Sequence, residues 1–239
     1  MSAEREALVL LPGFLCDQSY WQDQIDALSN VAECSCAEYG MLDSLPAMAE
    51  SVLRNAPERF SLAGHSMGGR IALEVYRQAP ERVKRLALLN TGATPRAAGV
   101  VGEEEERGRR GLLEIAQTQG MRAMALQWIP NMVAPARRSD IALTEAITRM
   151  FERKNPQIFE AQMKALLGRP DATTLLGRIS CPTLVLTGRE DGWSTPAAHQ
   201  QIASAVPNSR LVLVPKSGHM STMERPAEVA EAMRSWLEN

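Results

Sequence analysis

Short apolar runs alternate with longer amphipathic stretches over the first 93 residues of the chain. The apolar runs predict strands over residues 7–11, 31–37, 59–63 and 83–89. Polar and apolar positions at helical spacing predict one helix from a capping Ser44 to Asn55 and another over residues 67–78. Nearly continuous apolar strands that alternate with helices are typical of a parallel sheet covered on both faces.

The strand pattern disappears between residues 94 and 176, where only helical periodicity is found, over residues 103–119, 122–128, 139–153 and 156–167. The alternation then returns, with strands over 183–187 and 210–214 and helices over 196–206 and 227–237. We therefore predict an α/β fold with a mostly parallel, doubly wound sheet, formed by residues 1–93 and 177–239. Residues 94–176 form a helical cap, expected at the carboxyl edge of the sheet where open α/β sheets bind ligands.

A G-x-S-x-G motif, Gly64-His65-Ser66-Met67-Gly68, lies between a predicted strand and a predicted helix. A serine on such a sharp turn adopts a strained backbone, and its small neighbours let the chain double back. The Ser66 hydroxyl would then stand above the sheet at a helix N-terminus, where negative charge is favoured. The alternative is an ordinary glycine-rich turn, so the motif needs a base and an acid elsewhere in the chain.

The chain has three histidines, and only one of them has the expected position for a general base. His219 follows the last predicted strand, so it lies at the same sheet edge as Ser66. His65 adjoins the serine, where a side chain on the turn generally points elsewhere. His199 lies within a predicted helix and is most simply a surface or packing residue. A serine hydroxyl needs such a base within hydrogen-bond reach, and His219 is the candidate.

The orienting acid should follow another strand at that edge. Asp191 comes a few residues after the predicted strand over 183–187, with Glu190 as its competitor. Asp191 precedes Gly192, and an Asp-Gly turn suits the presentation of a short carboxylate. An ordinary role in the turn is the alternative for Asp191.

Two backbone N–H groups are candidates for the oxyanion hole that receives the charge developing on a substrate carbonyl. One belongs to Met67, directly after the serine, and the other to Phe14 in the loop after the first predicted strand. Gly13 would allow this loop to approach a substrate closely. Pro12-Gly13 also ends the strand, and the two interpretations are compatible.

The motifs L-L-P-G-F, G-H-S-M-G-G, G-R-E-D and S-G-H-M occur in the order and places found in the α/β-hydrolase superfamily. The whole chain resembles this superfamily, and it is similar to small bacterial carboxylesterases and 3-oxoadipate enol-lactone hydrolases. It departs from them in Pro12-Gly13, where relatives often have His-Gly, and in lacking the usual first two strands. The resemblance implies a triad in the order Ser66, Asp191, His219.

This resemblance implies a serine hydrolase that cleaves a small to medium carboxylic ester through an acyl-enzyme, without a cofactor. The alternative enzyme is an enol-lactone or C–C bond hydrolase, or a related lyase-type synthase, that uses the same triad. A non-catalytic binding protein is the other class. Turnover of p-nitrophenyl acetate separates an enzyme from a binding protein, since fold alone does not decide function.

Four side chains are the predicted substrate contacts: Leu15, Trp128, Trp193 and Met220. Arg70 and Arg189 are the only fixed cations that the sequence places near them, which gives a strongly anionic substrate no special support. The acidic run 103–106, followed by Arg107, Arg109 and Arg110, is interpreted as a solvated helix start, with acids first as the helix dipole favours. A docking patch is the alternative for this charged segment.

Composition excludes several other functions. The 239 residues are 45% hydrophobic and carry a net charge of −2. The sequence therefore lacks the excess of basic residues that binding to nucleic acid or to an anionic membrane requires. No apolar run reaches the ~20 residues of a membrane span, and no secretory signal is found. Four cysteines lack further ligands at metal-binding spacing, so no metal site is predicted. We expect a cytoplasmic monomer or homodimer whose partner is a small-molecule ester or lactone.

Overall fold

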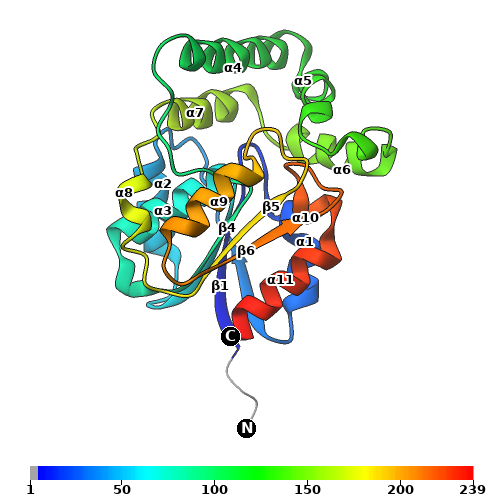
Figure 1. The fold of residues 1–239 in the computed structure, drawn as a ribbon. Helices are drawn as coiled ribbons and strands as arrows, with labels where there is room; N and C mark the ends of the chain where they lie inside the picture. Colours follow the sequence, from blue (N-terminus) through cyan, green and yellow to red (C-terminus); the bar gives the residue numbers. More distant parts are fainter. Residues whose placement is uncertain (1–4, 239) are drawn as a thin grey trace.

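The computed structural model describes residues 5–238, in which six strands form one sheet (Figure 1). Their order is β2-β1-β3-β4-β5-β6, and all five neighbouring pairs are parallel. The strands are β1 (Glu6–Leu11), β2 (Ala32–Cys36), β3 (Phe60–His65), β4 (Val83–Leu89), β5 (Thr183–Gly188) and β6 (Ser209–Val214). The predicted α/β fold class is confirmed.

Helices cover both faces of this sheet, as the apolar strands required. On one face lie α1 (Gln22–Leu28) and α11 (Pro226–Glu238), and on the other lie α2 (Leu45–Asn55), α3 (Met67–Gln78) and α9 (Pro196–Ala205) (Figure 1). Strands β3 and β5 are buried at every position, because each has strands on both sides and helices on both faces. The chain turns to opposite sides of β1 when it forms β2 and then β3, and this reversal opens a ligand-binding crevice at their carboxyl ends.

The segment between β4 and β5 is helical, and most of it lies above the carboxyl ends of the strands (Figure 1). It contains α4 (Val100–Gln119), α5 (Met121–Trp128), α6 (Ile141–Glu152) and α7 (Pro156–Leu167), with 3-10 turns at Ile129–Asn131 and Pro135–Arg137. The short helix α8 (Thr173–Leu176) instead lies beside the α2 and α3 layer. The Ala172 N–H donates to the Ala93 carbonyl at 2.9 Å, so the last residues of the predicted cap contact the core.

The predicted elements agree with the structure to within about three residues, and the misses are short. Helices α1, α8 and α10 (Ser221–Glu224) were not predicted. Helix α1 buries only Gln24 and Leu28, so it has almost no apolar face to detect. Helix α6 begins after Asp140, whose side chain accepts the Leu143 N–H at 3.0 Å, and not at Ser139 as predicted. Local capping chemistry sets these boundaries.

Candidate active site

Ser66 occupies a tight turn between β3 and α3. Its backbone angles are φ 54° and ψ −114°, a conformation that residues other than glycine rarely adopt. A Cβ atom on Gly64 would overlap the Gly68 carbonyl, and one on Gly68 would overlap the Leu11 carbonyl at the end of β1. The glycines therefore permit the close backbone approach that lets a strained serine project from the sheet edge.

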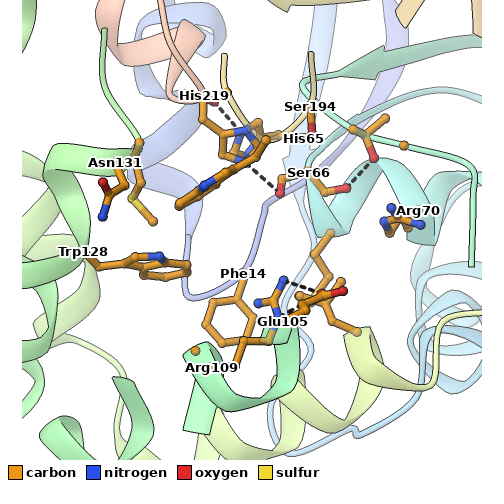
Figure 2. Close-up of a pocket in the computed structure, with 18 of the residues that line it drawn as sticks. Phe14, His65, Ser66, Arg70, Glu105, Arg109, Trp128, Asn131, Ser194 and His219 are labelled. Carbon is orange, nitrogen blue, oxygen red and sulfur yellow. Dashed lines mark hydrogen bonds and ion pairs between the residues drawn. The ribbon is translucent and has the colours of Figure 1, made fainter. Parts of the chain in front are cut away.

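A continuous chain of hydrogen bonds joins Ser66, His219 and Asp191. Nδ1 of His219 lies 2.8 Å from Oδ2 of Asp191, and Nε2 lies 2.9 Å from Oγ of Ser66 (Figure 2). Because a carboxylate only accepts hydrogen bonds, Nδ1 carries the proton and Nε2 is free to accept the Ser66 hydroxyl proton. The structure thus brings together the three residues that the sequence predicted, in an arrangement that can activate the serine.

Asp191 is held as a carboxylate. Its Oδ1 accepts the backbone N–H groups of Trp193 and Ser194, each at 2.9 Å, and its Oδ2 accepts from Asn90 at 2.9 Å. Burial raises the pKa of Asp191, but His219 and these donors outweigh burial and hold the pKa well below its usual value. The competitor, Glu190, has an exposed side chain and only its backbone N–H is bonded, to the Ser217 carbonyl.

Asn90 is a site residue that the sequence analysis missed. It follows β4, is fully buried, and donates from Nδ2 both to Asp191 and to the Gly218 carbonyl. Its Oδ1 accepts the Ser221 hydroxyl. The sequence signal that could have identified Asn90 is its position directly after the predicted strand over 83–89. A polar residue there lies at the same sheet edge as Ser66. Asn90 positions both Asp191 and the loop that carries His219.

Glu224, also missed, ties the loop of His219 to the helical segment between β4 and β5. Its Oε1 accepts the N–H groups of Gly218 and Met220 at 2.9 and 3.2 Å, and its Oε2 accepts that of Ala134 at 2.8 Å. The His219 N–H donates to the Met132 carbonyl at 2.6 Å. Burial raises the pKa of Glu224, and the three N–H donors oppose that rise. The carboxylate therefore fixes the backbone on both sides of the histidine.

Replacing Glu224 by Gln should lower the free energy of unfolding by about 1–3 kcal/mol, because one acceptor oxygen becomes an amide donor that faces a backbone N–H. Urea unfolding followed by circular dichroism measures this change. Glu228→Gln is the matched control, since Glu228 is an exposed carboxylate near the start of α11. Equal stability of the Glu224→Gln and Glu228→Gln variants would contradict the role assigned to the Glu224 carboxylate.

A cavity of about 680 Å³ lies over Ser66 and is lined by both the core and the helical segment (Figure 2). Three of the predicted substrate contacts, Trp128, Trp193 and Met220, line it. Trp128 packs against Phe14 and Trp193, with ring centroids 5.6 and 5.5 Å apart, and forms an aromatic wall. Leu15 is not among the lining residues. Its side chain is fully buried in the core, so its prediction as a substrate contact is wrong.

The charged segment at the start of α4 was interpreted wrongly in part. Glu105 and Arg109 line the cavity, whereas Arg107 and Arg110 are exposed. Glu105 forms ion pairs with Arg109 at 3.1 Å and with Arg169 at 2.7 Å. Because side chains four residues apart share a helix face, one face of α4 turns two charges inward while the other is solvated. Arg189, the second cation expected near the site, is exposed and lies outside the cavity lining.

The two N–H groups predicted to receive an oxyanion also belong to residues of the cavity wall. Met67 is the first residue of α3, where backbone N–H groups lack an intrahelical partner, and Phe14 lies in the loop after β1. Within residues 5–238, no protein acceptor is hydrogen bonded to the N–H of Phe14 or of Met67. Both N–H groups are therefore left without a partner by the described part of the protein.

The chain belongs to the alpha/beta hydrolase family, whose profile matches residues 8–232. It is 28% identical to the pimeloyl-[acyl-carrier protein] methyl ester esterase of Nitrosomonas europaea, over 92% of this chain and 91% of that protein. A thermophilic esterase from Thermogutta terrifontis has a similar structure, with a TM-score of 0.85, 28% identity and coverage of 98% of this chain and 89% of that one. The enol-lactonase from Burkholderia xenovorans shares the fold, with a TM-score of 0.85, 23% identity and coverage of 99% and 93%. The family resemblance is confirmed.

Within residues 5–238, no group of three or more His, Cys, Asp or Glu side chains is arranged to hold a metal ion. No helix in this part of the chain is both long enough and apolar enough to cross a bilayer.

Proposed function

We propose that this protein is a serine hydrolase that cleaves a small to medium carboxylic ester through an acyl-enzyme. The observation that carries the proposal is the chain of hydrogen bonds from Ser66 through His219 to Asp191 beneath a partly apolar cavity. An activated hydroxyl beside unpaired N–H donors is the combination that acyl transfer requires. Two of the similar proteins reported above, both described as esterases, support an ester as the bond that is cleaved.

In the proposed reaction Ser66 Oγ attacks the ester carbonyl carbon while its proton passes to Nε2 of His219. The N–H groups of Phe14 and Met67 stabilise the negative oxygen of the tetrahedral intermediate. The intermediate collapses, the ester C–O bond breaks, and the departing alcohol takes the proton from Nε2. Water then attacks the acyl-enzyme with the same base, which releases the acid and restores Ser66. Asp191 stabilises the imidazolium in both steps.

A serine-directed fluorophosphonate tests this proposal. We expect one equivalent to attach at Ser66 and to abolish turnover of p-nitrophenyl acetate, since the probe captures only an activated serine. Peptide mass spectrometry locates the adduct, and turnover after exhaustive chelation of divalent ions should remain unchanged. Labelling at another residue, or activity that survives full labelling of Ser66, would contradict the assignment. Enol-lactones tested beside simple esters distinguish the alternative reaction that uses the same residues.

A further inference from the structure

Arg70 lies one helical turn from Ser66. Ser66 immediately precedes α3, and Arg70 is the fourth residue of that helix. Both line the cavity, and Figure 2 shows Arg70 apart from the dashed ion pair between Arg109 and Glu105. A rise of about 6 Å along α3 separates the two positions. A ligand in this cavity can therefore contact both Ser66 and Arg70.

The other two cavity arginines have carboxylate partners within the protein. Arg169 contacts both oxygens of Glu105, at 2.8 and 2.7 Å, and Arg109 contacts Oε1 of the same residue at 3.1 Å. Arg169 and Arg109 therefore share one carboxylate, and the three side chains together keep a net charge of +1 beside Arg70. Glu104 also lines the cavity, but its side chain is exposed.

Arg70 has no such partner among residues 5–238. Its one hydrogen bond runs from Nη1 to the Thr94 carbonyl at 2.7 Å, which satisfies one of five N–H donors. Burial and the positive charges of Arg169 and Arg109 lower the pKa of Arg70 to about 10, against an opposing contribution from Glu105, so Arg70 remains a cation at neutral pH. Anchoring of the loop at Thr94 would account for one of the five N–H donors of Arg70. It does not explain why a half-buried cation faces an aromatic cavity when the nearby carboxylate of Glu105 is ion-paired with Arg109 and Arg169.

We propose that Arg70 binds a free carboxylate of the substrate, so that the natural substrates are half-esters or lactones that carry a second carboxylate a few carbons from the bond cleaved. This inference rests on the proposed function and narrows its substrate class. A carboxylate would pair with the unused donors of Arg70, and such charge-assisted bonds are the stronger kind in a site that excludes water. The aromatic wall of Phe14, Trp128 and Trp193 would contact the apolar remainder. The carboxylate belongs either to the acyl part or to the leaving group.

Paired substrates test the proposal. The acyl arm compares monomethyl esters from succinate to pimelate with analogues in which the free carboxylate is a neutral amide. The leaving-group arm compares 4-acetoxybutanoate with its amide. We expect the wild type to prefer the carboxylate in one arm by about 10- to 100-fold in kcat/KM, as the usual strength of a charged hydrogen bond implies. The arm that shows the preference identifies the part that carries the charge.

Substitutions assign this preference to Arg70. Arg70→Gln should reduce it at least tenfold, and Arg70→Lys, which keeps the charge, should retain part of it. Arg77→Gln is the matched control, because Arg77 lies on the same helix but bonds Glu74 and the Asp171 carbonyl outside the cavity. A wild-type preference near one in both arms, or an unchanged preference in Arg70→Gln, would overturn the proposal.

A binding measurement separates this inference from the proposed function. Calorimetry of adipate with the Ser66→Ala variant should show binding that is lost when Arg70→Gln is added. If no ester is hydrolysed but adipate binding still depends on Arg70, the esterase proposal fails and the carboxylate subsite stands. If esters are hydrolysed without a carboxylate preference and adipate does not bind, only the subsite proposal fails.

Discussion

Asp191→Asn is expected to lower kcat by about 10⁴-fold with little change in KM, the size of the effect that this substitution has in a serine protease. The amide would turn donors toward Nδ1 of His219 and favour the tautomer whose proton points at Ser66. That tautomer cannot accept the hydroxyl proton. Asn90 would also lose an acceptor, so the free energy of unfolding should fall by about 1–3 kcal/mol. Steady-state kinetics and urea unfolding measure the two effects.

The neighbouring carboxylate provides the control for this prediction. Glu190 is exposed and its side chain forms no bond to His219, so Glu190→Gln should change kcat less than about twofold, as is usual for a surface substitution. If Glu190→Gln were the damaging change and Asp191→Asn were not, the orienting acid would be displaced by one residue. If both were harmless, the orientation of His219 would depend on another group, and the proposed mechanism would fail at that step.

Ser66→Ala should reduce kcat by about 10⁶-fold, as loss of the nucleophile does in a serine protease. Ser66→Gly should be equally inactive but more stable than Ser66→Ala by about 1 kcal/mol, because only glycine adopts φ 54° and ψ −114° without a steric penalty. Thermal and urea unfolding of the two variants measure this difference.

Ser61→Ala is the control for the loss of activity. Ser61 is a buried serine at the opposite end of β3, where it donates to Glu6 at 2.8 Å, so its removal should affect stability and leave catalysis intact. Activity retained in Ser66→Ala would show that another residue is the nucleophile. Equal stability of the Ala and Gly variants would show that the turn stores no strain at Ser66.

The sheet and the reactive groups could be predicted because their signals are local. Strand β3 is a continuous apolar run that leads into G-x-S-x-G, and His219 and Asp191 each follow a strand within a few residues. The parallel sheet then brings these separate loops to one edge. Boundaries were less exact where a cap residue such as Asp140 decides the first turn of a helix.

The residues that were missed act through partners far away in the sequence. Asn90 bonds Asp191 across 101 positions, and Glu224 bonds Ala134 across 90. The same reason explains the error at α4. Glu105 faces inward because Arg169, 64 positions later, supplies its partner. Helical periodicity does not show which charged face packs against a neighbouring helix, since that depends on the tertiary arrangement.

The carboxylate of Glu224 also has a consequence for motion. Its two oxygens accept hydrogen bonds from Ala134 and from the backbone on both sides of His219. Movement of Ala134 away from the sheet would therefore displace His219 from Ser66 and Asp191, unless the bond to Glu224 breaks. Helix α4, which lies between Gly99 and Gly120 at the other end of the helical segment between β4 and β5, is held instead by the ion pair between Glu105 and Arg169. The position of His219 is thus coupled to that of Ala134 through the Glu224 carboxylate.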